Sequence, residues 1–242
     1  MSNKKSLASS GRRGVVLLSG GLDSATTLYL AKSKGFKCFC LIFDYGQRHK
    51  KEIESAKKIA KSAGCPYQIL KIKLPWKGSS LLDKKIKLPI TNCRLPIIIP
   101  STYVPARNIV FLSFALSFAE AINAEAIFIG ANAVDFSGYP DCRPEFYRAF
   151  NKIIAVGTKA GVEKRTLEVK APLMRKTKGE IIQLGNRLGV PFELTWSCYQ
   201  GGRRPCGECD SCYFRAKGFK EAGIKDPLLA GTVPEGDCPA TR

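Results

Sequence analysis

Histidine is nearly absent from this chain of 242 residues, in which His49 is the single one. Metal sites rich in histidine are therefore excluded, and a Ser-His-Asp mechanism would depend on that one ring. Long apolar runs are also missing, because no stretch approaches the ~20 residues that a membrane-spanning helix needs. No apolar segment precedes residue 15, so the first residues lack the pattern of a secretory signal. We therefore expect neither a membrane span nor export.

Acidic residues are scarce, with 20 Asp and Glu against 39 Lys and Arg, and the formal net charge is +19. The imbalance lies mainly in residues 1–100, where 20 basic and 5 acidic residues contribute +15 of that charge. Such a field attracts polyanions. Lysines at solvent-facing helix positions produce the same count, however. We therefore interpret the excess as surface charge and do not favour contact with nucleic acid.

Cysteine is the exception to this scarcity, and four of the ten cysteines fall within fifteen residues: Cys198, Cys206, Cys209 and Cys212. The other six are scattered through a chain that is large enough to build a core without disulfide bonds, so we expect a reducing cytoplasm. Four thiolates at this spacing are typical of a tetrahedral Zn²⁺ without an open position, which predicts a structural zinc site. An iron–sulfur cluster stays open as an alternative, because its cysteines have the same short spacing.

Short apolar runs alternate with helical patterns from residue 14 to about residue 190. We predict strands at residues 14–18, 38–43, 67–74 and 126–130, and helices at residues 23–34, 52–63, 108–123, 145–155 and 177–188. This alternation predicts an α/β fold, a Rossmann-like open parallel sheet with helices on both faces. The cysteine cluster then forms a small zinc-binding appendage at the C-terminal side.

Two segments of the chain carry more specific signals. Thr177 and Glu180 can each accept a hydrogen bond from the other's backbone amide, which predicts a capping box at the start of the last helix. Residues 75–106 contain five prolines and little periodicity. We predict a long irregular segment there, of a kind that is often functional in compact domains.

A glycine-rich turn, Ser19-Gly-Gly-Leu-Asp-Ser24, lies between the first predicted strand and the first predicted helix. Its glycines let the backbone approach a phosphate closely, and the N–H groups at the helix start form an anion site. The turn is not a Walker A loop, because the lysine of GxxxxGK[ST] is missing. An ordinary turn that caps the helix is the alternative that the residues alone leave open.

This turn resembles the SGGxDS loop of the adenine nucleotide α-hydrolase-like enzymes. The resemblance implies adenylation chemistry, with the β,γ-pyrophosphate of ATP bound by Leu18, Ser19, Gly20, Gly21, Leu22, Asp23 and Ser24. It also implies that Asp23 helps to hold Mg²⁺ against the phosphates. Adenine is expected near the end of the second strand, at Asp44. A turn residue at the end of a strand is the alternative for Asp44.

A polar loop follows the fourth predicted strand over residues 130–145, and loops at this edge of open α/β sheets bind ligands. Amide, carboxylate and guanidinium groups can bind the edge of a heterocyclic base. The candidates for such a role are Asn132, Asp135, Tyr139, Asp141 and Arg143. A purely structural loop is the alternative.

Longer strings resemble the 7-cyano-7-deazaguanine synthase family of the queuosine pathway. They are LSGGLDS at 18–24, DYGQRH at 44–49, YVPARN at 103–108, IFIGANAVDFSGYPDCRPEF at 127–146, APL and TKGEI within 171–181, and the cysteine box with GFKEAGIKDPL at 218–228. The resemblance implies an ATP-dependent ligase that converts 7-carboxy-7-deazaguanine and ammonia from solution to 7-cyano-7-deazaguanine through an adenylated acid and an adenylated amide. It implies a homodimer, and catalytic roles for Asp23, Arg107 and Lys178.

The resemblance also divides the chain. It makes residues 14–190 an ATP-binding pyrophosphate-loop domain and residues 191–228 a region with four zinc-binding cysteines, with flexible tails at 1–13 and 229–242. A tRNA-thiolating enzyme is the alternative function, since it would share the loop and an adenylated intermediate. Such enzymes typically need a catalytic cysteine pair or an RNA-binding appendage, and here we interpret the clustered thiols as metal ligands. A zinc-ribbon RNA-binding module would account for the charge and the cysteines but not for the glycine-rich turn.

Overall fold

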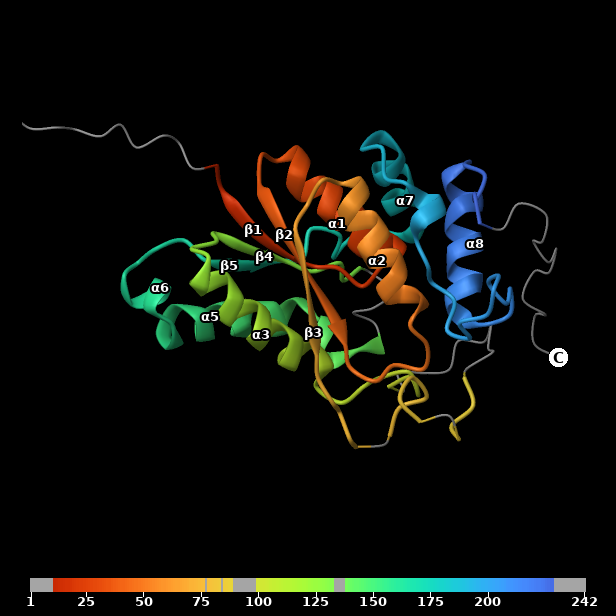
Figure 1. Cartoon of the computed structure of the whole chain (residues 1–242), viewed down its shortest axis with the longest axis horizontal. Helices are drawn as coiled ribbons and strands as arrows, with labels where there is room; N and C mark the ends of the chain where they lie inside the picture. Colours follow the sequence, from red (N-terminus) through yellow and green to blue (C-terminus); the bar gives the residue numbers. More distant parts are fainter. Residues whose placement is uncertain (1–10, 77, 84, 89–98, 133–137, 229–242) are drawn as a thin grey trace, which may run out of the picture.

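A five-stranded sheet lies at the centre of the molecule (Figure 1). The computed structural model describes residues 11–76, 78–83, 85–88, 99–132 and 138–228. In chain order the strands are β1 (Arg13–Leu17), β2 (Lys37–Asp44), β3 (Tyr67–Lys71), β4 (Ala126–Phe128) and β5 (Glu168–Lys170). Their spatial order is β3-β2-β1-β4-β5, and every neighbouring pair is parallel. The predicted open parallel sheet is confirmed.

Helices cover both faces of the sheet, as the sequence predicts (Figure 1). One face carries α1 (Leu22–Ser33), α2 (Lys51–Ser62), α7 (Lys178–Arg187) and α8 (Asp210–Ala222). The other face carries α3 (Arg107–Ala121), α5 (Pro144–Gly157) and α6 (Lys159–Val162). Two short helical turns are η1 (Pro140–Cys142) and η2 (Phe192–Leu194). Among the described helices, none is both long and apolar enough to cross a bilayer.

The apolar run of β1 is continuous because this strand is buried on both faces. Val16 packs among the buried side chains of α1, α2 and α7. Val15 and Leu17 point the other way and pack with buried residues of α3 and α5. The residues after β1 therefore leave the sheet between two packed layers, which fixes the position of the glycine-rich turn.

Strand β5, helices α6 and α8 and the short turns η1 and η2 were not predicted from the sequence. Strand β5 has three residues, and only Val169 between its two charged neighbours is buried. In α8 the buried positions are Cys212, Arg215, Gly218 and Phe219. Their spacing is helical, but only Phe219 is a large apolar side chain, so no hydrophobic pattern identifies this helix.

The C-terminal region packs on the helical layer of the sheet rather than standing apart. Phe219 of α8 joins the same core as α7 and contacts Phe192 edge to face, with ring centroids 5.4 Å apart. A buried ion pair connects Arg215 with Asp226 at 2.7 Å, and the Arg215 guanidinium also donates to the Thr195 hydroxyl at 2.7 Å. Of the predicted tails, residues 1–10 and 229–242 lie outside the described residues, and Arg13 belongs to β1.

The predicted capping box at the start of α7 is confirmed. The Glu180 amide donates to the Thr177 hydroxyl at 3.2 Å, and the Thr177 amide donates to the Glu180 carboxylate at 2.7 Å. Both bonds satisfy amides that the helix itself leaves without partners. They fix the first turn of α7, whose first residue is Lys178.

Replacing Thr177 with alanine is expected to lower the free energy of unfolding by about 1 kcal/mol, because one cap acceptor is lost. Urea denaturation of the variant and the parent protein measures this difference. Thr177→Ser is the matched control, since it keeps the hydroxyl, and we expect it to unfold within a few tenths of a kcal/mol of the parent. Equal stabilities for the alanine variant and the parent would contradict a stabilising cap.

Candidate active site

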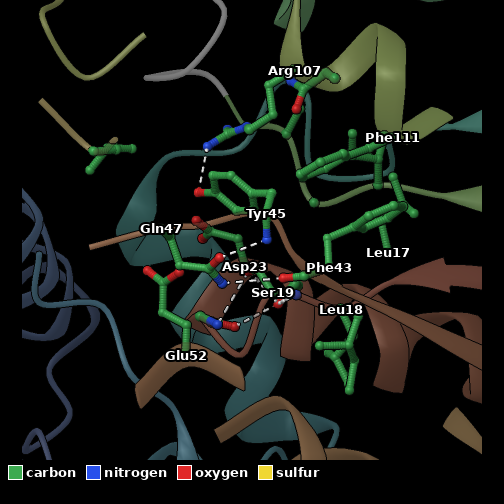
Figure 2. A pocket seen from close by; sticks show the side chains of 18 of the residues that line it. Leu17, Leu18, Ser19, Asp23, Phe43, Tyr45, Gln47, Glu52, Arg107 and Phe111 are labelled. Atoms are coloured by element: carbon green, nitrogen blue, oxygen red, sulfur yellow. Dashed lines mark hydrogen bonds between the residues drawn. The ribbon is translucent and has the colours of Figure 1, made fainter. Parts of the chain in front are cut away.

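A cavity of about 270 Å³ opens at the carboxyl ends of β1, β2 and β4 (Figure 2). The chain leaves β1 toward β2 on one side, while β4 returns to pair with β1 on the other. Open α/β sheets bind ligands in the crevice at such a reversal of strand order. The wall also includes Leu81 and Thr102 from the segment that was predicted to be irregular and functional.

The glycine-rich turn forms the floor of this cavity, with Leu18, Ser19, Gly21, Asp23 and Ser24 in its wall. The Ser19 hydroxyl lies 3.0 Å from the Ser24 hydroxyl, which donates to the Gly21 carbonyl at 3.0 Å. These hydrogen bonds within the turn stabilise its shape. Its backbone amides precede α1, where the N-terminus of a helix favours an anion.

Gly20 is the position at which this turn requires glycine. Its φ is +90°, and a Cβ there would lie 2.2 Å from the Glu52 carbonyl oxygen of α2. The Gly20 carbonyl accepts a hydrogen bond from the Trp196 amide at 2.9 Å. The turn is thus held between α2 and the segment that leads to the cysteine cluster.

Asp23 connects three parts of the chain that are far apart in sequence. The Lys178 ammonium donates to both oxygens of its carboxylate, at 2.9 and 2.7 Å. The Asn132 side-chain amide donates to the same carboxylate at 3.1 Å. The structure therefore brings together one predicted residue from each of the turn, the polar loop and the capped helix.

The C-terminal helix positions Lys178. A Cβ at Gly218 of α8 would lie 2.4 Å from the Cγ atom of Lys178 and 2.9 Å from its Cβ atom. The aliphatic part of the lysine side chain thus lies directly on α8, which directs the ammonium group toward Asp23. Gly218 lies inside a helix and has no positive φ. Glycine is therefore needed at this position because a larger side chain would collide with Lys178, and not because of the backbone conformation.

Replacing Gly218 with alanine is expected to lower activity on the order of 10-fold to 100-fold, because the added methyl group displaces Lys178 by a fraction of an ångström or more. Alanine favours a helix over glycine by about 1 kcal/mol, so thermal denaturation is not expected to show a loss of the helix. Lys217→Ala, at an exposed neighbouring position, is the control. Unchanged activity of the Gly218 variant would contradict this positioning role.

Arg107 lies at the other end of the cavity from the glycine-rich turn. Ala106, which precedes it, has a left-handed backbone with φ of 53°, and its amide donates to the Tyr103 hydroxyl at 3.0 Å. The guanidinium donates to the Tyr45 hydroxyl at 3.5 Å (Figure 2). A non-glycine residue in this conformation costs about 1 kcal/mol or more and is common at functional sites. Here it aims a cation into the cavity.

The candidate residues of the polar loop separate into several groups. Tyr139 lines the cavity, and its hydroxyl lies 2.6 Å from that of Thr102. Asp141 is buried and accepts a hydrogen bond from the Asn108 amide at 3.0 Å, which holds the first turn of α3 beside Arg107. Arg143 is exposed and lies outside the cavity wall. Asp135 lies outside the described residues.

Two further predicted positions have a different setting from that expected. Asp44 ends β2 and lies 3.6 Å from the Lys50 ammonium, but it is not in the cavity wall, where Phe43 and Tyr45 lie on either side of it. Successive side chains of a strand point to opposite faces of the sheet. Asp44 therefore points away from the cavity that Phe43 and Tyr45 line. Leu22 is buried in the core on the first helical layer.

Several residues of the cavity wall carry no signal that singles them out in the sequence. They are Gln47, Arg48, His49, Glu52, Thr102, Phe111 and Tyr199. Some fall within the string DYGQRH, so the resemblance marks their segment but not their roles. Glu52 is an acidic residue in the first turn of α2, a common position for surface carboxylates. Only the packing of α2 against the turn shows that it faces the cavity.

The four clustered cysteines converge on one point. The Sγ atoms of Cys198, Cys206, Cys209 and Cys212 all lie within 4.8 Å of one another. The amides of Cys206 and Gln200 donate to the Cys198 sulfur at 3.3 and 3.4 Å. Hydrogen bonds from the Cys209 and Cys212 thiols hold the pKa of Cys198 well below its usual range. The cluster has the donor set and the spacing to bind a metal ion.

The cysteine cluster contacts the cavity through His49 and Tyr199. A Cβ at Gly201, where φ is +71°, would lie 2.3 Å from the Cγ atom of His49. The His49 ring therefore packs on the backbone of Gly201, and Tyr199 itself lines the cavity. Loss of the cluster would therefore remove part of the cavity wall.

One family profile, described as "Queuosine biosynthesis protein QueC", matches residues 13–223. The 7-cyano-7-deazaguanine synthase of Trichodesmium erythraeum is 52% identical over 90% of this chain and 100% of its own length. The enzyme of that name from Desulfitobacterium hafniense is 53% identical over 93% of this chain and 95% of its own. Among solved structures, NMN synthetase from Francisella tularensis has a TM-score of 0.47 and 16% identity, and the match covers 95% of this chain and 81% of that one.

Proposed function

The chain belongs to the family of queuosine biosynthesis protein QueC, and from this premise we propose that it is the ligase that makes 7-cyano-7-deazaguanine. The substrates are 7-carboxy-7-deazaguanine, ammonia and ATP. The observation that carries the proposal is the identity of 52% to a synthase of that name over 90% of the chain. The cavity supports the proposal, because the glycine-rich turn, which is suited to phosphate, and the Arg107 guanidinium line the same space.

We assign the glycine-rich turn to ATP. The amides of the turn and the N-terminus of α1 would hold the β,γ-pyrophosphate, with the Ser19 and Ser24 hydroxyls as donors. The Asp23 carboxylate would hold Mg²⁺ on the phosphates, and Lys178, which pairs with it here, would then be available for a phosphate oxygen. When bound, Mg²⁺ neutralises the charge that develops on the leaving pyrophosphate. Adenine would lie along the end of β2, where Phe43 lines the cavity.

We assign the Arg107 end of the cavity to 7-carboxy-7-deazaguanine. The guanidinium would bind the carboxylate, because a charge-assisted hydrogen bond is about twice as strong as a neutral one. Tyr139 and its partner Thr102 offer hydroxyls to the edge of the base, and Phe111 offers an aromatic face. Asn132 and Asp141 support this arrangement through Asp23 and Asn108. Asp135 and Arg143 stay candidates from the resemblance.

The reaction takes two activations at this one site. A carboxylate oxygen first attacks the α-phosphorus of ATP, and pyrophosphate leaves. Ammonia then attacks the acyl carbon, and AMP carries that oxygen away from the amide. In the second activation the amide oxygen attacks ATP, and loss of AMP and of the nitrogen protons leaves the nitrile. The protein contributes orientation and charge stabilisation in both rounds.

We assign Zn²⁺ to the four clustered cysteines, as a structural ion. A tetrahedral ion with zinc–sulfur bonds of ~2.3 Å separates its sulfurs by ~3.8 Å, and the Cys206 and Cys212 sulfurs lie 3.9 Å apart. An iron–sulfur cluster binds its cysteines through different iron atoms and spreads them further apart. Four protein ligands leave no open position, so the ion would cross-link α8 to the cavity wall.

The compartment and the assembly complete the proposal. None of the described cysteines forms a disulfide bond, which supports the reducing cytoplasm. Exposed apolar side chains on α3 and α5 support a homodimer through that layer: Ile109, Phe114, Ile153 and Val156 are 42–81% exposed. Sedimentation of the protein tests the dimer, and Phe114→Glu is expected to shift it to the monomer.

Mass spectrometry of a reaction mixture tests the function. Purified protein is incubated with Mg-ATP, ammonium and 7-carboxy-7-deazaguanine, and we expect the nitrile and AMP to form together. Consumption of ATP without nitrile would contradict the substrate assignment and favour tRNA thiolation, the alternative. Absence of both products from folded, metal-loaded protein would contradict the whole proposal.

A further inference from the structure

Two carboxylates line the described part of the cavity wall, and their settings differ. Asp23 has its negative charge compensated by the Lys178 ammonium and accepts a further hydrogen bond from Asn132. Glu52 has no such partner: among the described residues, none hydrogen-bonds or ion-pairs with its carboxyl group. Figure 2 shows both carboxyl groups directed into the cavity, Asp23 from α1 and Glu52 from α2.

The position of Glu52 is fixed by its own backbone. The Glu52 carbonyl oxygen lies so close to Gly20 that a Cβ atom at position 20 would be 2.2 Å from it. The first turn of α2 therefore cannot move without moving the turn assigned to ATP. Glu52 is partly buried, and this burial raises its pKa to about 7. A carboxyl group that titrates near neutral pH can both accept and release a proton there.

The charged groups around Glu52 come from several elements. Arg107 of α3 acts on it across the cavity as the opposing cation, and Cys198 of the metal cluster acts on it as a thiolate. Tyr45 accepts a hydrogen bond from Arg107 and also interacts electrostatically with Glu52. Lys51, its neighbour on α2, lies over the Trp196 ring at 5.1 Å and so points away from the cavity.

His49 is the other basic side chain of the wall that could take a proton. Its ring packs on the backbone of Gly201, and its Nδ1 atom is buried without a partner among the described residues. A ligand in the cavity therefore does not reach that nitrogen. Glu52 is the better placed of the two.

We propose that Glu52 binds the ammonium ion and removes its proton, so that ammonia is generated beside the adenylated acid. This inference rests on the proposed function. Ammonium transfers one proton to the Glu52 carboxylate, and the free ammonia attacks the acyl carbon, forming the C–N bond as the C–O bond to AMP breaks. The nitrogen loses a second proton to water, which yields the neutral amide. Glu52 returns its own proton to water before the next turnover.

Arg107 and Glu52 act on opposite charges in the same cavity. The Arg107 cation attracts the carboxylate of the base, and Glu52, on which Arg107 acts across the cavity, attracts the ammonium cation. Ammonium is the main form of ammonia near neutral pH and has no lone pair for attack. A proton acceptor inside the cavity therefore raises the concentration of the nucleophile where the acyl carbon is held. A positioned acid–base group contributes typically 10²-fold to 10⁴-fold.

Glu52→Gln tests this role, since it keeps the shape of the side chain and removes its charge. With 7-carboxy-7-deazaguanine and ammonium at neutral pH, the variant is expected to lose about 10²-fold or more in kcat/KM for ammonium. With the pre-formed amide and ATP, it is expected to make nitrile within about threefold of the parent, because no ammonia enters that half of the reaction. Glu54→Gln, at an exposed position on the same helix, is the control and is expected to match the parent in both assays.

A pH profile separates a proton acceptor from a structural residue. In the parent, kcat/KM for total ammonium is expected to fall below pH about 7, because Glu52 then becomes protonated. In Glu52→Gln we expect no inflection of kcat/KM near pH 7. Its kcat/KM for total ammonium should follow only the fraction of ammonia that is unprotonated at each pH.

Two outcomes would overturn the inference. The first is parental ammonium kinetics in Glu52→Gln. The second is an equal loss with the acid and with the amide in a variant whose thermal unfolding matches that of the parent. In either case nitrile formation by the parent protein shows that the proposed function itself stands. A parent protein that makes no nitrile is instead the failure of the proposed function.

Discussion

Replacing Asp23 with alanine is expected to lower nitrile formation by about 10³-fold or more, the largest effect of any single substitution in the cavity. The carboxylate is the meeting point of Lys178 and Asn132. Its removal leaves the Lys178 ammonium without its partner and removes the group assigned to Mg²⁺. Both activations use the same turn, so conversion of the acid and conversion of the amide should fall together. Quantification of nitrile and AMP from each substrate measures this.

Two further variants make the Asp23 result specific. Asp23→Asn keeps the size of the side chain and should lose nearly as much, because the charge is what the turn requires. Asp44→Asn changes a carboxylate outside the cavity wall and is expected to stay within a few-fold of the parent. Retention of more than a tenth of the activity by the alanine variant would contradict the role assigned to Asp23.

Loss of the Zn²⁺ ion that we assign to the cysteine cluster is expected to have the largest effect on folding. Binding of structural Zn²⁺ contributes on the order of 10 kcal/mol in small domains, and that free energy is part of folding. Cys206→Ser removes one of four sulfurs that lie within 4.8 Å of one another. We therefore expect the yield of folded protein to fall more than the activity per folded molecule. Metal analysis, thermal denaturation and active-site titration of the purified variant measure the two effects separately.

A second cysteine supplies the control for this experiment. Cys65 is a buried free thiol two residues before β3, remote in sequence from the cluster, and Cys65→Ala is expected to keep the full metal content. Treatment of the parent with a chelator should reproduce the Cys206→Ser phenotype. Normal folding of Cys206→Ser together with a dead site would contradict a structural ion and indicate a metal that takes part in the reaction.

The fold was predictable because its signals are local. The apolar run of β1, the glycine-rich turn and the Thr177–Glu180 capping box each occupy a few consecutive residues, and each has one physical solution. Alternation of such segments allows few topologies other than a parallel sheet. Strand β5 and helix α8 gave no such signal, because their buried positions are few or are held by Cys, Arg and Gly.

The site was predictable only in part, because its geometry is set by contacts between distant segments. Asp23 and Lys178 were both candidates, but nothing local indicates that their side chains form an ion pair across 155 positions. Glu52 was missed for the same reason, since its role follows from the packing of α2 on Gly20. Arg143 and Asp44 are polar residues in the expected loops that the strand and helix geometry turns away from the cavity.

Activation of first the acid and then the amide by ATP in one cavity can be followed through the carboxylate oxygens. The experiment uses 7-carboxy-7-deazaguanine with a heavy oxygen isotope in both carboxylate positions, and mass spectrometry of the AMP that forms. We expect two AMP for each nitrile, each carrying one labelled oxygen, because each activation transfers one carboxylate oxygen to the α-phosphorus. Unlabelled AMP would show that ATP is hydrolysed by water, and a single labelled AMP for each nitrile would show that the second dehydration does not use adenylation. Either result would contradict two successive adenylations in this cavity.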